Sequence, residues 1–210
     1  MPHTYTSDVA FTPAVKAAQQ RHSSRAQYAR MEETRGWQSK VTDDLAAFIA
    51  ERDSFYLATA NAEGQPYIQH RGGPKGFLRV LDDKTLAFAD FKGNRQYITT
   101  GNLADNDRAF IFLMDYASRR RIKIWGRARV VEGDDALINR LFVPGYKARP
   151  EQAILFTIEA SDVNCPQHIP QKFAAEEVAD AVGRLQARIA ELEADVARLR
   201  DRTARDTVSA

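Results

Sequence analysis

The sequence is poor in the residues that build covalent and metal-based frameworks. Only one of its 210 residues is a cysteine, Cys165, which excludes an internal disulfide and a multi-cysteine zinc site. The four histidines form no helical metal-ligand pair, so we expect no metal site. Because the chain does not use disulfides, we expect it to work in a reducing, cytoplasmic compartment.

Long apolar runs are missing as well. The longest runs, such as residues 109–114, are far shorter than the stretch of about 20 residues that a membrane helix needs. The first ten residues lack a basic segment followed by an apolar one, so we expect no secretory signal. A membrane partner is therefore not expected.

An excess of charge of one sign is also lacking. The chain has 30 basic and 28 acidic residues and a formal net charge of +2, which gives no general attraction to nucleic acid. Locally, Arg119, Arg120, Arg121 and Lys123 form a basic cluster. Such a cluster is typical either of a solvated strand edge that resists aggregation or of an anion site, and both interpretations stay open.

The common catalytic signatures do not occur. The chain has neither a Gly-x-Gly-x-x-Gly fingerprint nor a Gly-x-x-x-x-Gly-Lys-Ser/Thr loop, which disfavours nucleotide binding by those devices. It also lacks a Gly-x-Ser-x-Gly elbow, so a hydrolase is poorly supported. No side chain can be named as a catalytic acid or base from the sequence.

Composition divides the chain into three segments. Residues 1–40 are polar and arginine-rich, and we expect a loosely organised helical arm with a short helix that starts near Pro13. This arm is expected to pack on the body or on a partner subunit. Residues 41–173 form the expected main domain, and residues 174–210 form a separate helix.

Short strands dominate the main domain. Thr42 can cap a helix that places Leu45, Phe48 and Ile49 on one face. Further short helices are expected at residues 95–102 and 137–142. Strand patterns occur near residues 55–60, 65–70, 77–80, 85–89, 109–115, 121–131 and 154–159. Around six short strands joined by local hairpins predict a mostly β, α+β fold with an antiparallel barrel.

The last segment carries a heptad repeat. Its apolar positions are spaced alternately by four and three residues, and they are Val178, Val182, Leu185, Ile189, Leu192, Val196 and Leu199. Charged residues flank the stripe, and alanines fill the remaining positions. This pattern predicts a coiled-coil helix that self-associates, although a single helix packed on its own barrel could show a similar stripe.

One block between Tyr67 and Val131 resembles a known family. It contains QHRGGPKGF at residues 69–77, ADFKGNRQ at residues 89–96 and RRRIKIWGRA at residues 119–128. The order of an arginine-bearing strand, a strand ending in an Asn-Arg loop, a short helix and a strand ending in Trp-Gly-x-Ala resembles the split-barrel flavoproteins related to pyridoxamine 5'-phosphate oxidase. The resemblance covers about residues 45–160, and more narrowly it is to bacterial members that also carry NCPQHI, here residues 164–169.

The resemblance implies a six-stranded antiparallel split β-barrel with flanking helices and FMN at a homodimer interface. Arg95 and Asn94, at the start of the expected 95–102 helix, would bind the dianionic phosphate. Backbone groups at residues 76–78 would contact the polar edge of the flavin ring. The implied cofactor-binding residues are Arg71, Gly76, Phe77, Leu78, Ala89, Asp90, Asn94, Arg95, Gln96, Arg121 and Lys123. The competing interpretation is an exposed loop with an incidental Arg95 and a surface cation at Arg121.

The expected function is that of an FMN-dependent oxidoreductase. Hydride would come from a reduced nicotinamide or a small-molecule substrate, and oxygen or a small electrophile would reoxidise the flavin. Pyridoxamine phosphate is not the expected substrate. Gln96 occupies the position at which pyridoxamine 5'-phosphate oxidase has a lysine. The C-terminal segment that binds the substrate in that oxidase is replaced here by residues 169–173 and the heptad repeat.

Two other functions stay open. The chain could be a non-catalytic sensor or carrier of flavin, deazaflavin or haem whose C-terminal helix engages a partner or a higher oligomer. It could also be a purely structural oligomerisation protein. Packing roles are favoured for His70, Trp125, Cys165 and His168, while a reactive thiol or half of a metal site at the last two is the alternative.

Overall fold

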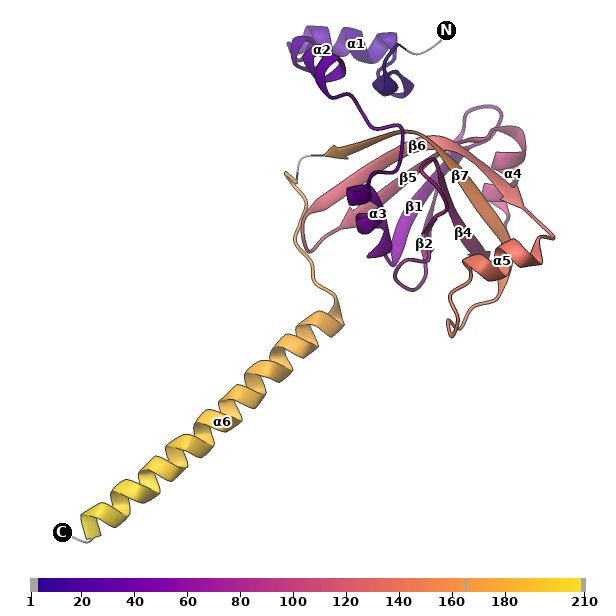
Figure 1. Ribbon diagram of the computed structural model, residues 1–210. Coiled ribbons are helices and arrows are strands. Elements are labelled where there is room, and N and C mark those ends of the chain that lie inside the picture. Colours follow the sequence, from indigo (N-terminus) through magenta and orange to yellow (C-terminus); the bar gives the residue numbers. More distant parts are fainter. Residues whose placement is uncertain (1–3, 165, 209–210) are drawn as a thin grey trace. The chain divides into compact units, whose positions relative to one another are not determined.

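The computed structural model of the chain describes residues 4–164 and 166–208. These residues belong to two compact units (Figure 1). One comprises Met1–Asp115 with Arg119–Ile169, and the other comprises Tyr116–Ser118 with Pro170–Ala210. Among the described helices, none combines the length and the apolar character needed to cross a membrane.

The first unit is built on an antiparallel sheet, as the sequence predicts. Among the described residues this sheet has seven strands in the order β2-β1-β5-β6-β7-β4-β3. Their bounds are β1 Ser54–Ala60, β2 Pro66–Gly72, β3 Arg79–Val80, β4 Thr85–Phe91, β5 Arg108–Asp115, β6 Arg120–Val131 and β7 Pro150–Asn164. The predicted number of six is one too low, and the strand pattern near residues 77–80 forms only the two-residue strand β3, which pairs with β4 at one edge. Short edge strands of this kind limit pairing with other chains.

The main core lies inside the curved sheet. Strands β1, β5 and β6 bury alternate residues, which is the pattern of a sheet with one face toward the core. The largest fully buried side chains include Phe55, Leu57, Phe88, Ile111, Leu113, Ile122, Ile124 and Phe156. Strand β4 is buried on both faces, because Ala87 and Ala89 pack in a second cluster with Ile138 and Leu141 of α5 (Asp135–Leu141).

Two helices of the barrel show how local sequence sets their ends. Helix α3 (Asp43–Ala50) begins after Thr42, whose hydroxyl accepts a hydrogen bond from the Leu45 N–H at 3.2 Å, as predicted. Helix α4 (Ile98–Asp105) begins three residues later than predicted. The reason is local: Arg95 and Tyr97 adopt left-handed backbone conformations with φ of 61° and 51°, which a helix cannot contain.

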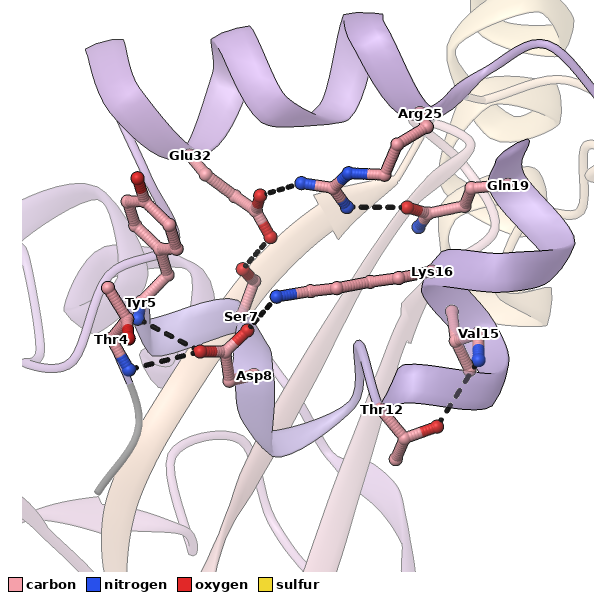
Figure 2. Close-up of polar contacts among 10 residues, drawn as sticks. All are labelled: Thr4, Tyr5, Ser7, Asp8, Thr12, Val15, Lys16, Gln19, Arg25 and Glu32. Carbon is pink, nitrogen blue, oxygen red and sulfur yellow. Dashed lines mark hydrogen bonds and ion pairs between the residues drawn. The ribbon is translucent and has the colours of Figure 1, made fainter. Parts of the chain in front are cut away.

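The N-terminal arm is more ordered than the sequence predicts. It forms the 3-10 helix η1 (Thr6–Val9) and the helices α1 (Pro13–Arg21) and α2 (Arg25–Thr34). Figure 2 shows Glu32, which is buried, accepting a hydrogen bond from the Ser7 hydroxyl at 2.9 Å and pairing with Arg25. Arg25 also donates to the Gln19 side chain at 2.6 Å. The expectation of loose organisation is wrong because these polar side chains satisfy one another instead of facing water.

The arm contacts the sheet through aromatic rings and a short backbone bridge. Trp37 stacks on Trp125 of β6 with ring centroids 4.7 Å apart, and Phe11 meets Trp37 edge-on. Ser161 of β7 donates its N–H to the carbonyl of Gln38 at 2.7 Å. Trp125 therefore has a packing role, as favoured from the sequence.

The second unit consists mainly of α6 (Ala175–Val208), the helix predicted from the heptad repeat. Before the helix, Lys172 donates its N–H to the carbonyl of Tyr116 at 3.4 Å and places its ammonium over the Tyr116 ring. His168 is exposed and has a positive φ of 63°, whereas Cys165 lies outside the described residues. Pairing of α6 with a second helix stays a prediction.

Gly126 marks a close approach between β6 and β7. The register of these strands shifts between Trp125 and Gly126, and a Cβ at position 126 would lie 2.1 Å from the Thr157 carbonyl oxygen. We expect Gly126→Ala to lower the free energy of unfolding by about 1–3 kcal/mol, because backbone must move to admit the methyl group. The control is Gly101→Ala in α4, where a Cβ meets open space and should be neutral or stabilising. Denaturant unfolding measures both, and equal effects would contradict the assignment.

Glu32 offers a test of the order in the arm. Glu32→Ala removes the acceptor of both Arg25 and Ser7, and we expect it to destabilise the arm by about 1–3 kcal/mol. Trypsin should then cleave within the arm faster than in the parent. Glu33→Ala, at the exposed neighbouring position, should leave the cleavage rate unchanged. If both variants behave like the parent, the buried network does not hold the arm.

Candidate functional site

The two ends of the sheet approach each other through side chains. Strand β2 is the first in the sheet order and β4 the last but one, and no backbone ladder joins them within the described strands. Instead, Arg71 of β2 donates to the carboxylate of Asp90 of β4. Both side chains are nearly buried, with 12% and 11% of their surface exposed. We call this open join between β2 and β4 the seam.

A pocket of about 250 Å³ lies at the seam. Tyr67, Gln69 and Arg71 face it because they are alternate residues of β2, whereas Ile68 and His70 lie on the other face of the strand. The rest of the seam pocket comes from the end of β4, the loop that follows it, the start of α4 and the start of β7. These lining residues are Asp90, Phe91, Gly93, Asn94, Arg95, Gln96, Tyr97, Ile98, Thr99, Thr100 and Glu151.

Side-chain hydrogen bonds fix the walls of the seam pocket. Gln152, which is buried, donates from its amide nitrogen to Asp90 at 2.9 Å and to the Thr100 hydroxyl at 3.0 Å. The Thr99 hydroxyl donates to the Gln69 side-chain oxygen at 3.0 Å. The first turn of α4 is thereby tied to β2, β4 and β7.

The loop before α4 brings polar groups to the mouth of the pocket. The Gln96 N–H donates to the Asn94 side-chain oxygen at 3.2 Å, and the Tyr97 hydroxyl donates to Glu151 at 2.8 Å. Tyr97 stands at the helix start and provides no side-chain cap. The N–H groups of the first turn of an α-helix have no partner within the helix, and the positive end of the helix dipole lies there, so the start of α4 suits an anionic ligand.

Two arginines, Arg71 and Arg95, line the seam pocket together with two carboxylates, Asp90 and Glu151. Burial lowers the pKa of Arg71, and the neighbouring Asp90 charge opposes that shift. At Arg95, which is exposed, interaction with the Tyr97 side chain raises the pKa. Because the pKa of arginine is so high, both guanidinium groups stay charged at any working pH.

Arg71 also carries an unused donor. Its Nε is buried and has no hydrogen-bond partner, and the same is true of the Nε atoms of Arg52 and Arg121. Of these three arginines, only Arg71 lines the seam pocket. A buried donor without an acceptor costs about 1–3 kcal/mol. The pocket is also lined by the exposed guanidinium of Arg95, and charged donors of this kind suit a phosphate group.

The structure brings together five of the residues implied by the resemblance. Arg71, Asp90, Asn94, Arg95 and Gln96 all line the seam pocket, although they come from two strands and a loop. Their role in binding stays a prediction. Sequence reasoning missed Gln69, Thr99 and Gln152 among others. Alternation along β2 could have indicated Gln69, whereas no local signal in the sequence connects Gln152 with Asp90.

Three other implied residues are buried in the interior, and a fourth, Gly76, precedes two of them in the chain. Phe77 and Leu78 are buried in the main core, and Ala89 belongs to the second cluster. The N–H groups of Gly76 and Phe77 already donate to the carbonyls of Arg52 and Pro74, both at 3.0 Å. In this conformation, these N–H groups are not free to contact a flavin ring.

Arg121 and Lys123 lie on one face of β6, as alternation predicts, but neither lines the seam pocket. Lys123 lines a larger hollow of about 620 Å³ between the arm and the sheet, together with Trp37, Trp125 and Asp162. Burial lowers the pKa of Lys123 and raises that of Asp162, its partner in the β6–β7 register. Within one chain, these two cations are therefore separate from Arg95.

Comparison with known proteins places this geometry in a family. The family model described as pyridoxamine 5'-phosphate oxidase matches residues 41–167, and the curated proteins contain no match. Among solved structures, HupZ of Group A Streptococcus is 21% identical with a TM-score of 0.49, covering 63% of this chain and 99% of that chain. An FMN-binding protein of Syntrophomonas wolfei is 14% identical with a TM-score of 0.45, covering 70% of this chain and 97% of that chain.

The heme storage protein HutZ of Vibrio cholerae is 16% identical with a TM-score of 0.40, covering 57% of this chain and 92% of that chain. The family match is the decisive finding, because it spans more than half of the chain and includes every strand of the sheet and the whole seam pocket. This chain belongs to the pyridoxamine 5'-phosphate oxidase family.

Proposed function

We propose that the chain binds FMN with its phosphate in the seam pocket and works as an FMN-dependent oxidoreductase in the cytoplasm. The observation that carries the proposal is that the nearly buried Arg71 and the exposed Arg95 line the same pocket beside the start of α4. The uncapped start of α4 adds further donors at that place. Membership of the pyridoxamine 5'-phosphate oxidase family supports FMN as the occupant.

Each residue has a distinct part in this proposal. Arg95 supplies a charged fork of donors at the mouth of the pocket, and Asn94 holds the loop through its hydrogen bond to Gln96. Asp90 pairs with Arg71, and Gln152 donates to Asp90, so the Arg71 guanidinium is held in place at the wall of the pocket. The bound flavin would supply hydride acceptance and donation, while the chain binds and orients it.

The size of the seam pocket supports a site shared between two subunits. Ligand pockets usually measure about 300–1,000 Å³, whereas the seam pocket of one chain measures about 250 Å³. It suits a phosphate and part of a sugar chain better than a whole flavin. We therefore propose a homodimer in which a second copy covers the ring, with a reduced nicotinamide or another small molecule as the electron donor.

The identity of the cofactor is tested directly on the purified protein. We expect a yellow protein with a flavin absorption spectrum, from which denaturation releases a compound with the mass of FMN. Turnover of NADH or NADPH with an electron acceptor then tests the oxidoreductase activity. A haem spectrum would overturn FMN as the cofactor, and a colourless protein that does not take up added FMN would overturn flavin binding altogether.

The phosphate site is tested by Arg95→Ala. Loss of a charge-assisted contact of about 1.5–3 kcal/mol should weaken FMN binding roughly 10- to 150-fold. Riboflavin, which lacks the phosphate, should bind the variant and the parent alike. Lys92→Ala is the matched control, because Lys92 is an exposed cation of the same loop that does not line the pocket. Titration of apo-protein measures all four affinities, and equal losses for FMN and riboflavin would exclude a phosphate role for Arg95.

A further inference from the structure

Helix α6 exposes a continuous apolar stripe. The stripe consists of Val178, Val182, Leu185, Ile189, Leu192 and Val196, each between 44% and 65% exposed, and Leu199 continues the spacing. Helices of globular proteins gain most of their stability from packing such a face against another element. Within the second unit, the few described residues outside α6 are too short a segment to cover a 34-residue helix. The stripe therefore needs a surface from elsewhere.

We propose that the stripe pairs with the same stripe of a second copy of this chain, as a parallel, in-register, two-stranded coiled coil. The first argument is the kind of side chain at each heptad position. Within the stripe, each a position carries a β-branched residue, namely Val182, Ile189 and Val196, and the d positions after the first carry leucine, as at Leu185 and Leu192. β-Branched residues at a with leucine at d favour two parallel strands over trimers and tetramers.

The second argument is charge complementarity beside the stripe. In a parallel, in-register pair, each g residue faces the e residue that lies five positions later in the other helix. Arg188 then faces Glu193 of the second copy, and Asp195 faces Arg200 of the second copy. Two-fold symmetry repeats both contacts. All four contacts join opposite charges. The charged residues at e and g therefore support this register, as do the apolar residues at a and d.

The ion pairs of the single helix do not compete strongly with this arrangement. Arg188 pairs with Glu191 at 2.6 Å, and Asp195 pairs with Arg198, each three residues apart on the helix surface. These side chains are between 40% and 75% exposed, and exposed pairs contribute little to stability. Exchange of these partners for residues of a second copy therefore meets little resistance. The proposal is independent of the cofactor.

Disulfide cross-linking of the full chain tests direction and register. In a Cys165→Ser background, Val178→Cys places a thiol at the first d position, where a parallel, in-register pair brings both copies within disulfide range. An antiparallel pair would place that thiol opposite the far end of the stripe. Asp180→Cys is the control, because position 180 lies on the outer face of the same helical turn.

We expect oxidation to cross-link the Val178→Cys protein almost completely, and at least 10-fold faster than the Asp180→Cys protein, as seen by non-reducing electrophoresis. Equal rates, or no cross-linking at position 178, would overturn the parallel pair. Packing of α6 on its own chain would give the second result.

Variants in the stripe and its flanks separate specific pairing from chance collision. In the Val178→Cys background, Leu192→Glu should slow cross-linking at least 10-fold, whereas Ala194→Glu on the outer face should not. Arg188→Glu and Glu193→Arg should each slow it roughly 3- to 10-fold, and the double variant should restore the parent rate, because the charges are exchanged across the same contact. If Leu192→Glu has no effect, or the double variant is slower than either single variant, the proposed register is wrong.

Discussion

The Arg71–Asp90 pair holds the seam of the barrel at a place where backbone hydrogen bonds do not. A sheet of seven strands in the order β2-β1-β5-β6-β7-β4-β3 leaves β2 without a ladder on its outer side among the described residues. The ion pair joins that edge to β4, and both charges are nearly buried. Charges removed from water in this way are tolerated only when further hydrogen bonds satisfy them, and Gln152 provides one to Asp90. The seam pocket exists because the join is made by side chains, which leave space that a ladder would fill.

The same pair connects stability with binding. Asp90 engages one nitrogen of the Arg71 guanidinium, and the nearly buried Arg71 side chain also lines the seam pocket. An anion in the pocket would meet a cation that Asp90 already holds in place, so little conformational entropy is lost on binding. For the same reason, Arg95 is the better position to test the ligand. Arg95 is exposed and does not join β2 to β4, so its removal should leave the barrel intact. Removal of Arg71 would leave the buried carboxylate of Asp90 without its ion-pair partner.

Local physics made part of this structure predictable. The Thr42 cap and the apolar face of α3 depend on neighbouring residues only, and alternation placed Arg121 and Lys123 on one face of β6. The family resemblance indicated residues 94–96, which do line the seam pocket. Residues that depend on distant partners were out of reach. Gln152 acts through Asp90, 62 positions earlier, and Glu32 is buried only because Ser7 and Arg25 reach it. The late start of α4 depends on the left-handed Arg95 and Tyr97, a conformation that ordinary helix propensities do not indicate.

Two surfaces of the chain are incomplete in the same sense. The seam pocket is smaller than a whole flavin site needs, and the α6 stripe presents apolar side chains that one helix cannot bury. A two-fold symmetric dimer can complete both, because an isologous contact brings each surface against its own copy and leaves no open end for further growth. The two contacts draw on different physics. The proposed cofactor binding at the seam would rely on charged donors held in place, whereas the proposed pairing of α6 would rely on apolar area and on the size and branching of side chains. Loss of one contact should therefore weaken assembly without removing the chemical basis of the other.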